Sequence, residues 1–124
     1  MARKIHALKE TSVANKLLGQ FKELEKLYVF KNPKEIYGFV LSNDFLLDIL
    51  FDAPDQISRI FGKVTLVLEL HRDPEEGWDE LFIVIKSPYG VEEAIRLEDK
   101  LAEEWFLDRM HDTQGKLNIT EEPI

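Results

Sequence analysis

Residues 63–86 read KVTLVLELHRDPEEGWDELFIVIK, and this stretch decides the fold class. Residues 63–71 alternate aliphatic and other side chains, and residues 80–86 repeat the alternation. A period of two residues is typical of strands with one buried face. The connection 72–79 contains a proline and a glycine, so we predict an antiparallel hairpin of strands 63–71 and 80–86 with a long acidic loop.

Helical periodicity flanks the hairpin on both sides. Residues 13–28 carry apolar residues at spacings of three and four, directly after the candidate caps Thr11 and Ser12, and residues 1–28 are assigned to a basic amphipathic N-terminal helix. Residues 43–51 predict a short helix, which the sequence DAPD should interrupt before a further helix ends at Gly62. Residues 91–109 predict the last helix.

Three segments are less regular. Residues 35–41 fit a helix after Asn32 and Pro33, whose types suit a helix start, but they also alternate as a strand would; we favour the helix. Residues 27–30, and residues 116–120 within the tail at 111–124, can supply one or two short strands. The whole chain, residues 1–124, is therefore predicted to be a single α+β domain, with a small antiparallel sheet covered by helices.

Composition excludes several classes of protein. The chain has 124 residues, 44% of them hydrophobic, which suits one folded domain and is too apolar for intrinsic disorder. Cysteine is absent, which removes disulfides, thiol catalysis and cysteine-ligated metal centres. The longest apolar runs are far shorter than the roughly 20 residues of a membrane helix, and the N-terminus does not resemble a secretory signal. We therefore expect a cytoplasmic protein without a membrane partner.

The net charge of −8 is unevenly distributed. Residues 1–34 contain eight basic and three acidic residues and carry +5, whereas residues 35–124 contain eight basic and twenty-one acidic residues and carry −13. Because residues 35–124 are so acidic, they repel phosphate backbones, and nucleic acid is therefore not a favoured partner. The basic segment is a candidate arm for nucleic acid or a membrane surface, but charge complementarity favours its folding back onto the acidic body.

The hairpin carries the densest group of candidate metal ligands. Glu69, His71 and Asp73 share strand parity, and Asp79 follows the predicted loop. Hard cations such as Mg²⁺, Mn²⁺ or Ca²⁺ prefer several carboxylate oxygens, so a metal-binding module or metal-dependent hydrolase is the alternative function. The spacing matches no calcium-binding loop, and charged strand ends commonly serve only to deter aggregation.

Glu98 falls within the apolar arc of the helix predicted at 91–109. A carboxylate in that place needs a partner, because burying an unpaired charge is costly. We expect the partner to come from another element, such as a basic residue of the N-terminal helix. The functional interpretation is a general acid or base, for which His71 is the plausible companion.

Apolar residues near the end of the same helix form the candidate interaction site. Phe106, Leu107 and Met110 lie off the arc that ends at Trp105, so this helix must bury more than one face. Either the core wraps around the helix end, or Trp105, Phe106, Leu107 and Met110 contact a protein partner or a second copy of the chain.

No template for catalysis is present: the sequence lacks a glycine-rich phosphate loop, HExxH and GxSxG. Four features carry a resemblance: residues 43–51, the pattern Ala53-Pro54 with Phe61-Gly62, the strand end at 68–75, and Glu103-Glu104-Trp105. In these features the chain resembles a family of small acidic prokaryotic proteins, itself uncharacterised. The resemblance spans about residues 27–107 and implies neither an activity nor a functional residue. The leading hypothesis is a non-enzymatic interaction or regulatory module without a cofactor.

Overall fold

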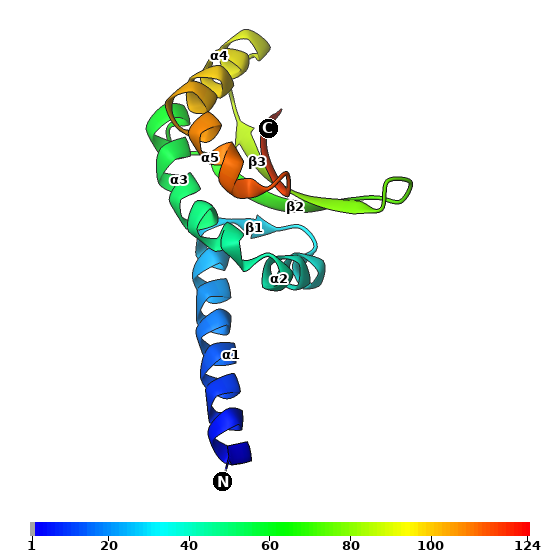
Figure 1. Cartoon of the computed structure of the whole chain (residues 1–124). Helices are drawn as coiled ribbons and strands as arrows, with labels where there is room; N and C mark the ends of the chain where they lie inside the picture. The colour runs from blue at the N-terminus through cyan, green and yellow to red at the C-terminus, as the bar shows by residue number, and fades with distance from the viewer. Residues whose placement is uncertain (1) are drawn as a thin grey trace.

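The computed structural model describes residues 2–124, with side chains described from Asn15 onward (Figure 1). It confirms the α+β class. The elements in chain order are α1 (Ala2–Leu27), β1 (Val29–Phe30), α2 (Pro33–Ser42), the 3₁₀ turn η1 (Asp44–Leu46), α3 (Leu47–Phe61), β2 (Thr65–Asp73), β3 (Trp78–Ser87), α4 (Val91–Leu101), the π-helical turn η2 (Ala102–Phe106), α5 (Leu107–Thr113) and β4 (Leu117–Pro123).

The four strands form one sheet in the order β1-β2-β3-β4. The central pair β2–β3 is the predicted antiparallel hairpin. The outer strands differ from the prediction of an antiparallel sheet, because β1 pairs with β2 and β3 pairs with β4 in parallel. In each case helices separate the two partners along the chain, and a helical crossover brings the next strand back in the same direction.

The hairpin is longer than predicted. Arg72 pairs with Asp79 and Asp73 with Trp78, so half of the predicted loop at 72–79 belongs to the strands. Gly77 adopts a φ of 71°, the left-handed region that favours glycine, within the short turn at the tip. The hairpin end extends beyond the helices as an arm (Figure 1).

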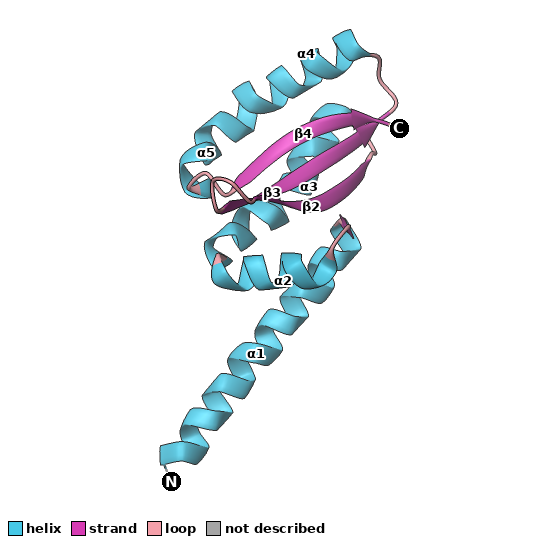
Figure 2. Ribbon diagram, turned by 90° about the vertical axis from the view of Figure 1, so that its right-hand side faces the viewer, coloured by secondary structure: helices cyan, strands magenta, loops and turns pink. Residues whose placement is uncertain are grey.

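The helices cover one face of the sheet. Leu66, Leu68 and Leu70 of β2 lie opposite Ile85, Ile83 and Leu81 of β3, and all six are buried. Within the described part of the chain, no helix lies over the other face, which is turned toward the viewer in Figure 2 with α3 behind it. The fold therefore has two layers, and the side chains of Val67, Phe82 and Val84 lie on the uncovered one.

α3 continues through Pro54, where the sequence predicted an interruption. Proline has no N–H, so in a helix it cannot donate to the carbonyl four residues earlier, which here is that of Leu50. The buried Tyr28 hydroxyl donates to the Leu50 carbonyl at 2.6 Å and replaces the missing bond. Burial raises the pKa of this hydroxyl far above its ordinary value, so it remains a donor. A tertiary contact thus permits a helix that local sequence disfavours.

α1 begins at Ala2, so Thr11 and Ser12 lie inside the helix and do not start it. The prediction that the basic segment folds back onto the acidic body is wrong. Phe21 and Leu24 are buried at the C-terminal end of α1, and this packing directs the helix away from the rest of the molecule (Figures 1 and 2). One straight helix cannot both pack there and turn back.

Residues 35–41 are helical, as favoured, within α2. Asn32 stands before this helix, but its side chain makes no capping bond to the helix backbone. The amide lies instead along the edge of β2, where Oδ1 accepts from the Leu70 N–H at 3.4 Å and Nδ2 donates to the Leu70 carbonyl at 3.5 Å. The Asn32 side chain therefore bonds to the part of the β2 edge, at Leu70, that lies beyond the pairing with β1.

Candidate functional site

The π-helical turn η2 divides the four predicted interaction residues into two pairs. A π turn adds one residue to the helical repeat, so the adjacent residues Trp105 and Phe106 are both buried, at 7% and 6% exposure. Trp105 Nε1 donates to Asp52 Oδ2 at 2.9 Å, and Arg109 donates to the same oxygen at 3.1 Å. Trp105 therefore belongs to the core between the helices, and not to a contact surface.

Leu107 and Met110 are the exposed pair, at 56% and 47%. Both line a hollow of 210 Å³ between the α4–α5 segment and β4, which we call the β4 groove. Figure 2 shows α4 running alongside β4. The residues lining the groove are Glu98, Asp99, Leu101, Ala102, Phe106, Leu107, Met110, Asn118 and Ile119. The structure thus gathers three of the four predicted contact residues and Glu98 around one apolar groove.

The outer edge of β4 forms one side of this region, and its N–H groups are largely occupied. The bonds from Leu81 N–H to the Lys116 carbonyl and from Ile124 N–H to the Ser87 carbonyl show that even-numbered residues of this strand face β3. The odd-numbered residues face outward. Ile119 N–H donates to the Asn118 side chain at 2.8 Å. Glu121 N–H bonds to Glu98, and Pro123 has no N–H.

An edge with its donors occupied is poorly suited to pair with an added strand. The groove therefore offers a partner an apolar side-chain surface that includes Phe106 and Ile119, and Glu98 and Asp99 are also among its lining residues. An amphipathic helix, which needs no backbone bonds from its receptor, is the type of ligand that such a groove accommodates.

As expected, Glu98 has a partner on another element, but this element is β4 and not the N-terminal helix given as an example. Partial burial raises the pKa of the Glu98 carboxyl above its ordinary value, and the nearby Glu121 carboxylate adds to this effect. The backbone hydrogen bond from Glu121 opposes both. The described contacts of His71 are with Glu69 and Phe82, so the structure does not bring His71 and Glu98 together as an acid–base pair.

We predict that Glu98→Gln stabilises the protein more at pH 7 than at pH 4. A carboxyl whose pKa is raised on folding contributes stability below its unfolded pKa and loses it as the pH rises through the folded pKa. The amide has no charge to bury at either pH and can still accept the Glu121 N–H. Urea denaturation of both proteins at the two pH values measures the difference. A Glu98→Gln effect independent of pH, equal to that of the exposed control Glu103→Gln, would contradict this account.

The other predicted site lies on the uncovered face of the sheet. Glu69 is 8% exposed, and its carboxylate lies 3.1 Å from His71 Nε2 and 3.2 Å from Lys31 Nζ. The hydrogen bond from His71, aided by Lys31, holds the pKa of the Glu69 carboxyl below its ordinary value in spite of burial. The His71 ring packs on Phe82, with centroids 4.5 Å apart. This carboxylate thus already has two partners.

The remaining predicted metal ligands have separate structural roles. Asp73 Oδ1 accepts the N–H groups of Glu75 and Glu76 at 2.9 and 3.0 Å and so shapes the hairpin turn. Asp79 lies opposite Arg72, hence on the other face of the hairpin from His71. Among the described residues, no three histidine or carboxylate side chains are grouped so that they could hold a metal ion. The geometry therefore adds no support to the metal hypothesis.

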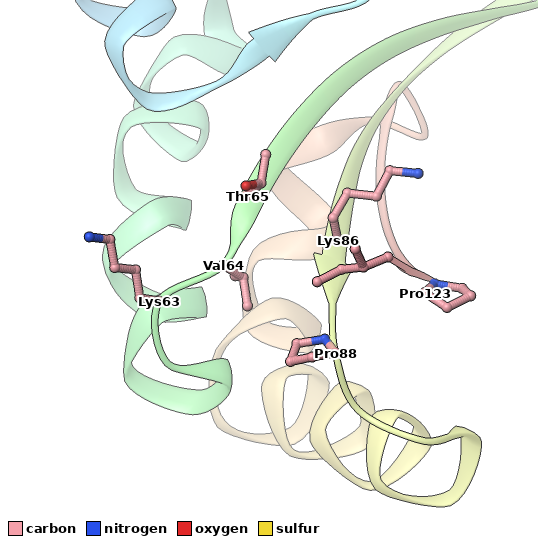
Figure 3. A pocket seen from close by; sticks show the side chains of 7 residues that line it. Lys63, Val64, Thr65, Lys86, Pro88 and Pro123 are labelled. Atoms are coloured by element: carbon pink, nitrogen blue, oxygen red, sulfur yellow. The ribbon is translucent and has the colours of Figure 1, made fainter.

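A hollow of 680 Å³ lies at the opposite end of the sheet from the hairpin tip and is lined mainly by apolar groups (Figure 3). Its two lysines do not converge on it, since the amino groups of Lys63 and Lys86 point away from Val64 and Pro88 in Figure 3. Lys86 Nζ donates to Glu122. This hollow therefore lacks the convergent polar groups that orient a small ligand.

Comparison of the chain with family models, curated proteins and solved structures gave no match. The resemblance to small acidic prokaryotic proteins therefore stays a prediction. Across the described residues, no helix combines the length and apolar character needed to cross a bilayer.

Sequence reasoning missed three residues that shape the groove. Asn118 and Ile119 come from β4, and Asp52 fixes Trp105 from α3. From the sequence alone, Asp52 is interpreted only as part of a helix break. The one usable signal was the adjacency of Trp105 and Phe106, two large apolar residues that a regular helix cannot place on one narrow stripe.

Proposed function

We propose that this chain is a non-enzymatic protein-interaction module that binds its partner through the β4 groove. The observation that carries the proposal is the position of Leu107 and Met110. Both are about half exposed, belong to α5 and line an apolar groove whose lining also includes the buried Phe106. Apolar side chains exposed together beside a buried aromatic floor are typical of contact surfaces.

The other candidate site, around Glu69 on the hairpin, is less suited to a function than the β4 groove. The Glu69 carboxylate is already bonded to His71 and Lys31, and a nearby hollow of 290 Å³ is lined by His71, Arg72, Asp73, Pro74, Trp78, Glu80 and Phe82. None of these lining residues is a serine, threonine, cysteine or lysine that could act as a nucleophile. The β4 groove needs no reacting group to serve as a contact surface.

The test replaces the exposed pair, Leu107→Glu together with Met110→Glu, in a tagged bait protein. Two carboxylates at these positions remove apolar contact and add a charge that a partner would have to desolvate. We expect the amount of specifically bound partner, including untagged copies of the chain, to fall at least about tenfold, because burying one leucine or methionine is worth about 1.5–3 kcal/mol. Quantitative affinity capture measures the change.

The matched control is Ile95→Glu, which places the same charge on α4 at a residue that is 54% exposed and does not line the groove. It should bind as the unaltered protein does. Thermal unfolding of all three proteins checks that each remains folded. Equal binding by the groove variant and the unaltered protein would refute the proposal, as would an unaltered protein that stays monomeric and binds nothing.

A further inference from the structure

α1 is a long helix, and only its C-terminal part is shown packing against the core. Leu17, Phe21 and Leu24 are the described α1 residues that pack against the core, whereas Leu18 is 55% exposed. The helix begins fifteen residues before Leu17, a length of about 20 Å at the rise of an α-helix. Figures 1 and 2 both show this part pointing away from the other elements. A single helix gains little stability in water without a surface to pack on.

The distribution of charge in the chain indicates which surface α1 could pack on. α1 contains six basic and three acidic residues, a net charge of +3. Residues 91–113, which form α4, η2 and α5, contain eight acidic and three basic residues, a net charge of −5. The two segments are electrostatically complementary, yet α1 points away from the body of its own chain. A second copy can present the acidic segment to it.

The exposed side of α1 also matches the β4 groove in its side chains. Leu18 and Lys22 are four residues apart, so they lie on one side of the helix, and both are exposed. The lining of the groove combines apolar side chains with Glu98 and Asp99. A leucine can enter the apolar part while the lysine one turn later approaches a carboxylate. The occupied N–H groups of the β4 edge favour such a helix over a strand.

We propose that α1 of a second copy occupies the β4 groove, with Leu18 against Met110 and Lys22 near Asp99. This inference rests on the proposed function, since it names the partner that the groove binds. Two copies that each contribute one helix and one groove form a closed, symmetric dimer.

The test uses the absence of cysteine from the natural sequence. One chain carries Leu18→Cys, and a second chain, enlarged by a tag, carries Met110→Cys. The two are mixed and oxidised, and a disulfide between them gives a product of distinct mass on a non-reducing gel. The matched control pairs Leu18→Cys with Ile95→Cys, an equally exposed position outside the groove. We expect the mixed product at least about tenfold more abundant for the groove pair, because proximity is required for the bond.

Sedimentation of the unaltered protein should give twice the 14.5 kDa of one chain. Leu18→Glu should weaken the self-association at least about tenfold while leaving the thermal unfolding of the body intact. A monomeric protein, or equal crosslinking of the groove and control pairs, overturns the inference. If the monomeric protein still captures another partner that Leu107→Glu with Met110→Glu abolishes, the groove keeps its proposed function and only the second copy is excluded. Loss of both results removes the proposed function as well.

Discussion

Trp105→Ala is expected to lower the free energy of unfolding by about 3–5 kcal/mol. The indole is 7% exposed, its ring centroid lies 5.9 Å from that of Phe106, and its N–H donates to Asp52. Truncation removes a large buried group, leaves a cavity beneath η2, and takes one of two donors away from the Asp52 carboxylate. Urea denaturation monitored by far-UV circular dichroism measures the loss.

Two further variants separate packing from surface effects. Trp105→Phe keeps most of the ring and loses the hydrogen bond, so a smaller loss of about 1–2 kcal/mol is expected. Leu107→Ala lies two residues away but is 56% exposed, and its effect should remain within about 0.5 kcal/mol. If Trp105→Ala lowered the free energy of unfolding as little as Leu107→Ala does, Trp105 would belong to the contact surface predicted from the sequence. Its assignment to the core would then be wrong.

Ile83→Ala is expected to cost about 2–5 kcal/mol, the range for large-to-small changes in a closed core. Ile83 has no exposed surface and lies in β3, one of the two inner strands, on the face that the helices cover. Its neighbour Val84 is only 1% exposed but faces the other way, onto the side of the sheet without a helix. Val84→Ala should cost about 1–1.5 kcal/mol, because water and adjacent strand side chains can fill the space.

The comparison of the two strand variants is informative because their starting exposures are nearly equal. Chemical denaturation at low protein concentration gives both values for the single chain. A Val84→Ala loss as large as that of Ile83→Ala would mean that the second face is covered in solution, contrary to the two-layer description.

The sheet could be predicted where its own sequence periodicity specifies it. Alternation in β2 and β3 identified the hairpin and its buried face, because one-sided burial forces a period of two. The parallel pairing of β1 and β4 could not be predicted, since two and seven residues respectively contain no information about which neighbour they join. The arrival of a strand after a helical crossover is a property of the whole chain.

The continuity of α3 through Pro54 was missed for a similar reason. From the local sequence, Pro54 leaves the Leu50 carbonyl without its helical donor, which predicts a break. Only in the folded chain does the Tyr28 hydroxyl replace that donor. Likewise, Asn32 was assigned to a helix start by its position before Pro33, while its amide in fact pairs with Leu70 on another element. Side chains that can serve either local or distant backbone are ambiguous in a sequence.

The candidate groove was half predictable. Leu107 and Met110 were identified because they lie off the buried arc of the helix, and both are exposed. A regular repeat predicts Phe106 on the same side of the helix as these two residues, whereas the π turn adds a residue and brings the rings of both Trp105 and Phe106 inward. The β4 side of the groove required the tertiary structure, since residues 117–123 reach it only through the sheet.

The bond from Tyr28 to the Leu50 carbonyl has a consequence for how the chain acquires its shape. Until the segment after α1 is seated, the middle of α3 lacks a donor at Pro54, so that helix is incomplete by itself. Residues 28 and 50 must therefore become ordered together, and fraying at one is transmitted to the other. In hydrogen exchange, the base of α1 and the centre of α3 should open as a single cooperative unit, with the projecting turns exchanging independently.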